Sequence, residues 1–184
     1  MVNGVDLSKY DNSFYNPGPL WKRFLWYGIN AAIFNSSMFP LYGLKVFLLR
    51  SFGARMGKNV FIKPRVSIKY PWLLQTGDNV WVGEKVWIDN LAKISIGNNV
   101  CLSQGSMLLC GNHDYAASTF DLIVKEIVLE NGVWIGAKAI VCGGVVCKDH
   151  SVLSVNSVAT CRLEPMCIYQ GNPAIKVKER KINT

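Results

Sequence analysis

The feature that most constrains the fold of this chain is a segment that occurs four times. The four copies align without gaps and read MGKNVFIKPRVSI, TGDNVWVGEKVWI, IGNNVCLSQGSML and LENGVWIGAKAIV. They begin at Met56, Thr76, Ile96 and Leu129, so the first two intervals between copies are equal and the third is longer. Self-similarity at a short and nearly constant spacing indicates a solenoid, in which each copy stacks on the previous one.

Within and after the last copy, an apolar or small residue returns at every sixth position. The two sets with this period are Leu129, Ile135, Val141, Cys147, Leu153 and Ala159, and, four residues after each, Val133, Ala139, Val145, Ser151, Ser157 and Leu163. A six-residue period is typical of a parallel β-helix whose short strands point one residue inward and whose corners turn on Gly, Asn or Asp. Three hexapeptides make a coil of about 18 residues. A spacing of 20 therefore leaves two extra residues per coil, which we expect as bulges around 74–76 and 94–96.

The third interval, from Ile96 to Leu129, contains an insertion that the other two lack. A stacked repeat accepts an insertion only at a corner, so we expect the stretch LCGNHDYAASTFD to leave the solenoid as a protruding loop within residues 109–125. This loop contains His113, one of only two histidines in the chain. A histidine beside Asn112 and Asp114 can cap a turn or can perform chemistry, and the pattern leaves both roles open.

The chain has 184 residues, of which 50% are hydrophobic and 17% charged, and this composition predicts one folded core with terminal additions. We expect an N-terminal helical capping segment over 1–55, a β-helix over 56–164 and a basic extension over 165–184. The net charge of +8 would suit a polyanionic partner. Because the basic residues are scattered and no nucleic-acid-binding motif occurs, nucleic acid is not an expected partner.

The six cysteines predict neither a disulfide framework nor a zinc site. They form no CxxC pair, no histidine follows at ligand spacing, and the N-terminus does not read as a signal peptide. We therefore expect reduced thiols that fill apolar space in a cytoplasmic protein, and no metal. Cys110, three residues before His113, is the one candidate for a covalent nucleophile.

Residues 24–44 form a stretch of 21 residues without a charge. Its length would allow a membrane span, but Asn30, Asn35 and Pro40 make it a poor one. We expect amphipathic helices on either side of Pro40. They would either lie on a membrane surface, giving peripheral contact with its inner face, or cap the core.

Several segments together resemble a known family. The repeats, GNHDYAASTFDL, VWIGAKAIV and the closing IYQGNPA are similar to the hexapeptide-repeat acyltransferases, and most of all to the sugar O-acetyltransferases of the colanic-acid type. LSKYDNSFYNPG, KYPW and VWIDNLA resemble the same subgroup. The resemblance implies an all-β solenoid with a left-handed parallel β-helix, a handedness that is an exception among parallel crossovers. It also implies a homotrimer, with active sites between neighbouring chains, that transfers acetyl from acetyl-CoA to a saccharide hydroxyl.

The same resemblance implies roles for individual residues. His113 is the general base that takes the proton of the acceptor hydroxyl, whereas His150, in CKDHS, lies at an uninterrupted corner. Asp89, Asn90 and Asp114 bind the acceptor, although Asp89 and Asn90 could equally be corner residues. The residues implied to bind coenzyme A are Trp134, Gly136, Ala137, Val155, Thr160, Cys161, Lys176, Lys178 and Arg180.

The last coil departs from the family pattern. Ser154, Val155 and Asn156 stand where relatives have small residues, and Cys161 stands where a lysine is common. Ile175 replaces the expected basic residue, so the phosphates of coenzyme A would have to be met by the basic residues that follow it. Two other functions are known for such a solenoid or compatible with it. A non-catalytic β-helix scaffold in a membrane-associated glycan-assembly complex stays open. A zinc-dependent carbonic-anhydrase-like site needs three histidines, and the two in this chain argue against it within one subunit.

Overall fold

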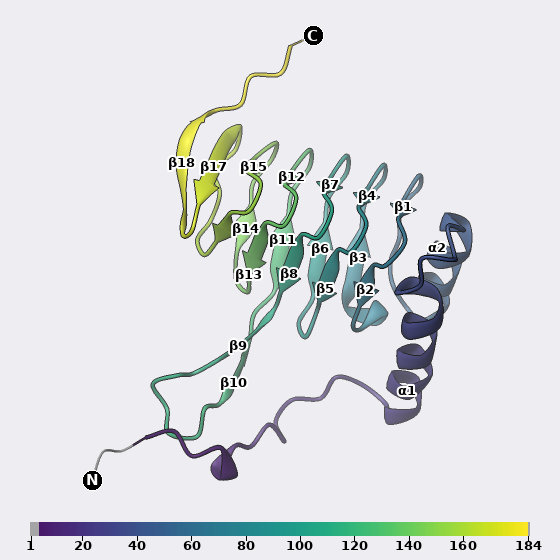
Figure 1. Cartoon of the computed structure of the whole chain (residues 1–184), viewed down its shortest axis with the longest axis vertical. Helices are drawn as coiled ribbons and strands as arrows, with labels where there is room; N and C mark the ends of the chain where they lie inside the picture. The colour runs from purple at the N-terminus through teal and green to yellow at the C-terminus, as the bar shows by residue number, and fades with distance from the viewer. Residues whose placement is uncertain (1–3, 184) are drawn as a thin grey trace.

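Three parallel sheets stack the coils of the repeat into a solenoid in this computed structural model, which describes residues 4–183 (Figure 1). The first sheet contains β1 (Phe61–Ile62), β4 (Trp81–Val82), β7 (Cys101–Leu102), β12 (Trp134–Ile135), β15 (Val152–Leu153) and β17 (Cys167–Gly171). The second contains β2 (Ser67–Ile68), β5 (Trp87–Asp89), β8 (Met107–Leu109), β13 (Ile140–Cys142) and β16 (Val158–Ala159). The third contains β3 (Leu74–Thr76), β6 (Ile94–Ile96), β11 (Ile127–Leu129) and β14 (Val146–Cys147).

The register of the strands confirms the alignment of the four copies. The sixth residues of the copies are Phe61, Trp81, Cys101 and Trp134, and each of them pairs with the next in the first sheet. Trp134 then pairs with Val152, so the coil between them has the length expected for three hexapeptides. Equivalent positions of the repeat therefore occupy equivalent places in successive coils.

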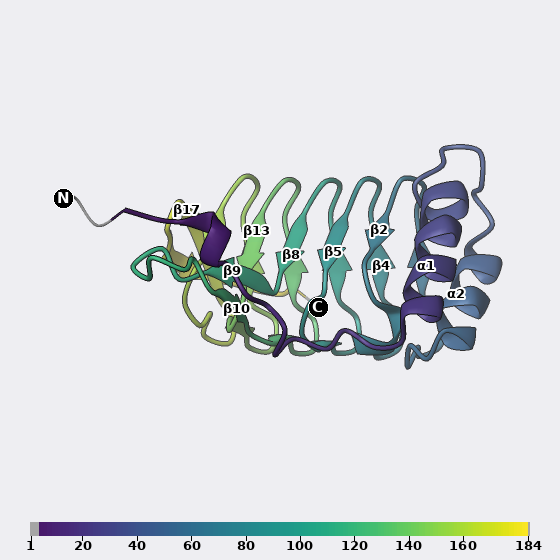
Figure 2. The ribbon, with the colours of Figure 1, turned by 90° about the horizontal axis from the view of Figure 1, so that it is seen from below.

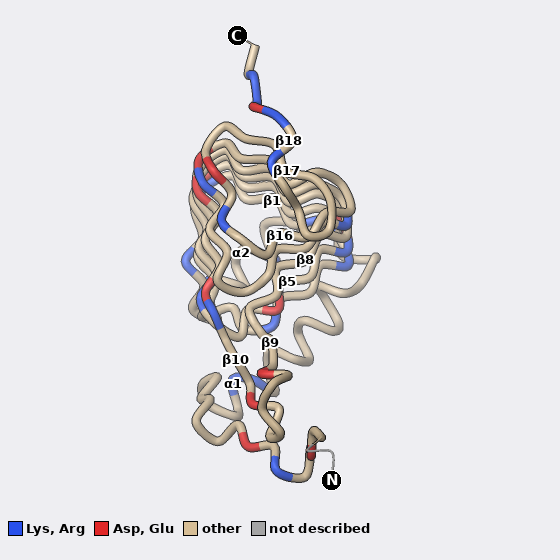
Figure 3. Tube along the Cα trace, turned by 90° about the vertical axis from the view of Figure 1, so that its left-hand side faces the viewer, with Lys and Arg blue, Asp and Glu red and all other residues tan. Residues whose placement is uncertain are grey.

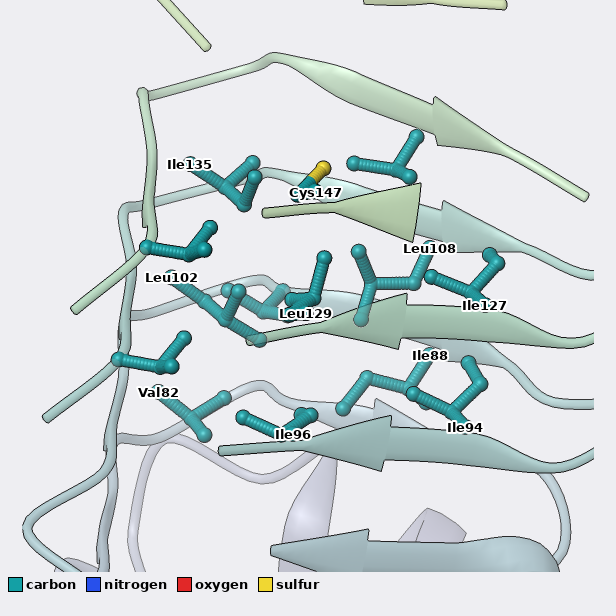
Figure 4. Packing of buried hydrophobic residues seen from close by; sticks show 14 of the residues in the cluster. Val82, Ile88, Ile94, Ile96, Leu102, Leu108, Ile127, Leu129, Ile135 and Cys147 are labelled. Carbon is teal, nitrogen blue, oxygen red and sulfur yellow. The ribbon is translucent and has the colours of Figure 1, made fainter. Parts of the chain in front are cut away.

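Both sets of residues with the six-residue period point into the solenoid. Every member of the two sets is buried, with at most 2% of its surface exposed. In Figure 4, Val82, Leu102 and Ile135 lie one above another, as do Ile96 and Leu129, so that each coil covers the apolar side chains of its neighbour. Removing this apolar surface from water is the main favourable term in the stability of the coils.

The predicted Asn-containing corners form a ladder along one edge. Asn59, Asn79 and Asn99 have φ values of 53°, 56° and 57°, which lie in the left-handed region. The Nδ2 of Asn59 donates to the Oδ1 of Asn79 over 3.0 Å, and Asn79 donates likewise to Asn99 over 3.1 Å. Asn tolerates this conformation better than most residues, so the ladder accounts for the recurrence of Asn at this corner.

The prediction of bulges at 74–76 and 94–96 is wrong. These residues form β3 and β6, and they pair residue for residue from Leu74 with Ile94 to Thr76 with Ile96. The additional residues lie in the preceding corner, where η3 (Pro71–Leu73) turns in one coil and 90–93 turn in the next. A corner accepts extra residues because its backbone is not committed to a continuous ladder.

Two short helices close the first end of the solenoid. α1 (Leu20–Ile29) continues into a π-helical turn, η2 (Asn30–Phe34), and α2 (Tyr42–Ser51) follows Pro40. Trp26, Phe34 and Leu49 are buried against the first coil, and the indole Nε1 of Trp26 donates to the carbonyl of Ile68 over 2.7 Å. The helices on either side of Pro40 thus cap the core. No helix among residues 4–183 has the length and apolarity needed to cross a bilayer.

The opposite end is closed by an antiparallel hairpin in place of another coil. β17 continues the first sheet and pairs with β18 (Ala174–Glu179). Cys167, Tyr169 and Ala174 of this hairpin are buried against the last coil. The C-terminal extension is therefore a folded part of the solenoid up to Glu179.

Replacement of Asn79 by Ala should lower the free energy of unfolding by about 1–3 kcal/mol, because Ala cannot join the ladder and is strained at positive φ. Asn79→Gly should cost less, because Gly adopts this φ without strain. Denaturant titration followed by circular dichroism measures both variants. Equal midpoints for the wild type and both variants would show that the ladder does not stabilise the coils.

Candidate active site

The insertion predicted as a loop is a β-hairpin that leaves the corner between the second and third sheets. β9 (Gly111–His113) pairs antiparallel with β10 (Leu122–Val124), and His113 is the partner of Leu122. At the base of the hairpin, the N–H of Lys125 donates to the carbonyl of Cys110 over 3.0 Å. Figure 2 shows the hairpin projecting from the solenoid with the N-terminal segment beside it.

His113 is held on the hairpin by Phe120. Its Nδ1 lies 3.0 Å from the carbonyl oxygen of Phe120, and the two rings stack with centroids 4.3 Å apart and planes inclined by 7°. Phe120 has a φ of 53°, in the left-handed region. A carbonyl oxygen only accepts hydrogen bonds, so Nδ1 carries the proton and Nε2 of the neutral ring keeps its lone pair. The imidazole is thereby oriented with Nε2 free to accept a proton.

The N-terminal segment completes the surroundings of His113. The N–H of Asp6 donates to the carbonyl of Ser118 over 2.8 Å, and the ring of Tyr10 lies 5.7 Å from that of His113. Leu7, Tyr10, His113 and Phe120 line a hollow of about 290 Å³. Of these four residues, the sequence predicted only His113; it did not predict Leu7, Tyr10 or Phe120 at the site. The only signal for the N-terminal pair was the resemblance of LSKYDNSFYNPG to the acyltransferase subgroup.

Asp89 lies at the foot of the hairpin. Its Oδ1 is 3.0 Å from the Nζ of Lys69, and its side chain is 15% exposed. With Trp87 and residues of α1, it lines a groove of about 470 Å³ between α1 and the second sheet. The nearby Tyr15 donates its hydroxyl to the carbonyl of Leu91 over 2.6 Å, and burial, reinforced by the charge of Asp89, raises the pKa of this phenol.

The other two residues predicted to bind the acceptor make local contacts. Asn90 is fully buried, and its side-chain amide accepts from the N–H of Tyr70 and donates to its carbonyl over 3.0 and 2.6 Å. It therefore has the corner role that the sequence left open. Asp114 accepts from the N–H of Ala116 over 3.0 Å at the start of the hairpin turn.

The residues before β17 that the resemblance implies to bind coenzyme A lie mostly at another corner. Gly136, Ala137 and Val155 stack at the corner between the first and second sheets, where a Cβ at position 136 would lie 2.6 Å from the backbone N of Val155. Trp134 faces outward from the first sheet and donates its indole N–H to Ser103 over 2.9 Å. Thr160 is exposed at the corner between the second and third sheets, as is Cys161.

The basic residues near the C-terminus have different surroundings. Lys176 and Lys178 are exposed on β18, and contact with the Cys167 side chain holds the pKa of Lys176 above its ordinary value. Arg180 instead donates to the carbonyls of Gly132 and His150 over 2.8 and 3.1 Å. Its guanidinium is thus used at a corner. The Nζ of Lys176 lies 4.0 Å from a carboxylate oxygen of Glu179, in an exposed pair that solvent or an anion can reach.

Within a single chain, the candidate base therefore lies apart from most of the candidate coenzyme residues. His113 projects from the end of β8, whereas Gly136 and Ala137 precede β13, at the opposite edge of the second sheet. The strands between these edges have three residues, which corresponds to about 10 Å. Within one chain, the two groups line different edges of the solenoid.

Cys110 is unsuited to act as a nucleophile. Its side chain is 1% exposed, and burial raises the pKa of the thiol to about 11. Nucleophilic attack requires the thiolate, which is scarce at neutral pH when the pKa is this high. Within residues 4–183, no cluster of three His, Cys, Asp or Glu side chains is placed to hold a metal ion.

Comparison with known proteins adds independent evidence. No family model matches the chain. The chain is 40% identical over 156 residues to the Escherichia coli K12 protein named as the colanic acid biosynthesis acetyltransferase WcaF, covering 85% of this chain and 86% of that protein. The fold of the present chain matches that of a hexapeptide-repeat acetyltransferase from Vibrio cholerae crystallised with acetyl coenzyme A (TM-score 0.80, 23% identity, 88% of each chain). It also matches a galactoside acetyltransferase in complex with coenzyme A (TM-score 0.79, 23% identity, 88% of this chain and 82% of that one).

Replacement of Cys110 by Ala should leave kcat close to that of the wild type, because a buried thiol with a raised pKa takes no covalent part in the reaction. In the native protein, Cys110 should also react far more slowly with a thiol reagent than the exposed Cys161. Steady-state kinetics and mass spectrometry of the labelled protein measure the two effects. A large loss of kcat in a folded variant would restore the covalent alternative.

Proposed function

Because the chain belongs to the hexapeptide-repeat acetyltransferases, which share a left-handed parallel β-helix, we propose that it acetylates a saccharide hydroxyl with His113 as general base. The observation that carries the proposal is the contact between Nδ1 of His113 and the carbonyl of Phe120, which leaves Nε2 as the proton acceptor. A saccharide acceptor is supported by the names of two similar proteins, one of colanic acid biosynthesis and one a galactoside acetyltransferase.

In the proposed reaction, Nε2 of His113 takes the proton of the acceptor hydroxyl as its oxygen attacks the thioester carbonyl of acetyl-CoA. A new C–O bond forms, the C–S bond breaks, and the sulfur of coenzyme A leaves. The imidazolium then returns its proton to this sulfur, so the products are the acetyl ester and coenzyme A as the free thiol. An imidazole suits both steps, because its neutral form can take a proton and its protonated form can return one near physiological pH.

We further propose that the donor and the base come from neighbouring copies in a homotrimer. Within one chain, His113 and the Gly136 corner lie at opposite edges of the second sheet, and the strand between these edges spans about 10 Å. Copies packed side by side would bring one chain's hairpin to another chain's corner. Trp81, Trp87 and Trp134 support such packing, because they leave 60%, 43% and 46% of their surfaces exposed on the sides of the solenoid.

For the acceptor, we propose the groove between α1 and the second sheet. Its wall carries Asp89 and Trp87, and Asp89 lies at the foot of the hairpin that bears His113. Asp89 and Asp114 would accept hydrogen bonds from acceptor hydroxyls. Asn90 would act through the corner that it ties to Tyr70, which keeps the adjacent Asp89 in place.

For the coenzyme, we propose that Lys176 and Lys178 meet the phosphates and that Trp134, Gly136, Ala137 and Val155 lie along the pantetheine arm. Thr160 and Cys161, one corner away, would contact a donor held between copies. A non-catalytic scaffold is the alternative, and it differs in a simple observable: a scaffold would release no thiol from acetyl-CoA in the presence of any saccharide.

Replacement of His113 by Ala should lower kcat by about 10²–10⁴-fold, the usual contribution of a positioned general base. The acceptor is first found by mass spectrometry of nucleotide-linked and lipid-linked sugars after incubation with acetyl-CoA. Thiol release then gives kcat. His150→Asn is the matched control and should have a kcat close to that of the wild type. His150 lies at the corner between the third and first sheets, away from the corner that bears the hairpin, and Asn tolerates its φ of 58°.

The His113→Ala protein should keep the mass of the wild-type assembly and its KM for acetyl-CoA, since the imidazole contacts only the hairpin and the N-terminal segment. Near-wild-type turnover by a folded His113→Ala protein would remove the catalytic assignment. The groove could then still bind the acceptor, but the base would lie elsewhere.

Joint replacement of Lys176 and Lys178 by Ala should raise the KM for acetyl-CoA and weaken its dependence on salt, because two exposed charges near the phosphates are lost. Arg180→Ala should mainly lower thermal stability, since its guanidinium bonds to two corner carbonyls. Initial rates at several ionic strengths and thermal melts distinguish the effects. If KM is unchanged in the double variant, the two lysines are ordinary solvated charges.

A further inference from the structure

The helices that cap the solenoid leave a broad apolar surface on their outer side. We call this the cap face, and its large apolar side chains are Leu20, Trp21, Phe24, Leu25, Tyr27, Met38, Phe39, Leu41, Leu44 and Phe47. Leu20, Phe24 and Tyr27 lie at its border, where they also line the groove beside α1. Several are more exposed than buried, with values of 68% for Trp21, 73% for Phe24 and 64% for Phe47. A contiguous apolar surface of this kind on a folded chain marks an interaction site.

Helical spacing explains why the same segment has two apolar sides. Trp26, Ile29 and Ile33 point to the core, whereas Trp21, Phe24 and Leu25 lie on the opposite side of the turn. Of the three charged residues between Leu20 and Leu49, Lys22 and Arg23 are partly exposed. Lys45 is fully buried, and its Nζ donates to the carbonyl of Lys63 over 3.0 Å. Lys22 lies over the ring of Trp72 and Arg23 lines the groove beside α1, so the large exposed side chains of the cap face are apolar.

The chain segment that forms the cap and the first coil carries charge of one sign. Residues 12–77 contain nine Lys and Arg but no Asp or Glu, whereas the rest of the chain contains eleven basic and twelve acidic residues. The part of the chain that forms the cap and the first coil thus carries a formal charge of +9, whereas the remainder carries −1. Arg50, Arg55, Lys58, Lys63 and Arg65 are exposed there. In Figure 3, the positions of Asp and Glu lie along the solenoid and around β9–β10.

The position of the cap face suits a flat partner. In Figures 1 and 2, α1 and α2 lie side by side across the end of the solenoid, beyond β1, and the hairpin of β17 and β18 lies at the other end. The coils extend away from the outer side of these helices. A planar surface can therefore meet the cap face while the sides of the solenoid stay accessible.

We propose that the cap face binds the surface of a bilayer that carries anionic headgroups. The apolar side chains enter the boundary between headgroups and acyl chains, where Trp21 and Tyr27 have a favourable place, and the basic side chains of the first coil attract the headgroups. A second copy of the chain fits less well, because face-to-face caps would bring together the basic side chains that flank each cap face. The inference does not depend on the acetyltransferase reaction.

Flotation with vesicles tests the proposal. The full chain should bind vesicles of phosphatidylglycerol and phosphatidylcholine, should bind pure phosphatidylcholine vesicles weakly, and should bind less at high salt. A variant with Trp21→Ser, Leu25→Ser and Phe47→Ser, none of which lines the groove beside α1, should lose binding at least about tenfold. Arg55→Gln with Lys58→Gln should weaken binding only to the anionic vesicles.

A matched control removes exposed apolar side chains from the opposite end of the chain. Val177→Ser with Ile182→Ser changes residues that are 48% and 52% exposed, and it should bind vesicles like the wild type. Melting curves confirm that each variant is folded. The proposal is overturned if the wild type does not bind anionic vesicles or if the triple variant binds as tightly. It is also overturned if light scattering shows that the triple variant breaks a contact between copies, because that face would then be occupied by protein.

Discussion

The in-register stacking of very short strands is the constraint on which the rest of the structure depends. Apart from β17 and β18, the strands of the three sheets have only two or three residues, and none of them could persist without the coil above and below. Each coil repeats the inward apolar residue of its neighbour, and the Asn59, Asn79 and Asn99 ladder repeats the corner. Additional residues can therefore enter only where the chain turns between sheets.

That constraint also explains where the candidate catalytic residue is found. The hairpin bearing His113 leaves a corner, so it can project without disturbing a ladder, and its base stays fixed by the hydrogen bond from Lys125 to Cys110. Phe120 and Tyr10 then surround the imidazole from two different parts of the chain. A rigid solenoid thus carries a side chain whose orientation is set by the hairpin and by the N-terminal segment.

The sides and the end of the solenoid are suited to different tasks. The candidate base and the candidate coenzyme residues lie along its edges, where neighbouring copies would meet in the proposed trimer. The cap face lies at the end and would stay free in a side-by-side assembly. If the copies are parallel, three cap faces would share one plane, and simultaneous contacts with one bilayer would strengthen one another.

The sequence by itself determined the β-helix, the residues that point inward, the corner that accepts the insertion and the helices on either side of Pro40. These features follow from periodicity and from local turn chemistry, which depend on residues close together in the chain. Only the tertiary structure decided that the extra residues of the shorter intervals lie in corners and not as bulges at 74–76 and 94–96. It alone brought Tyr10 to His113, engaged Arg180 with the carbonyl of His150, and left the outer side of α1 and α2 exposed. Such contacts join residues far apart in sequence, so they depend on the path of the whole chain and leave no local periodic signal.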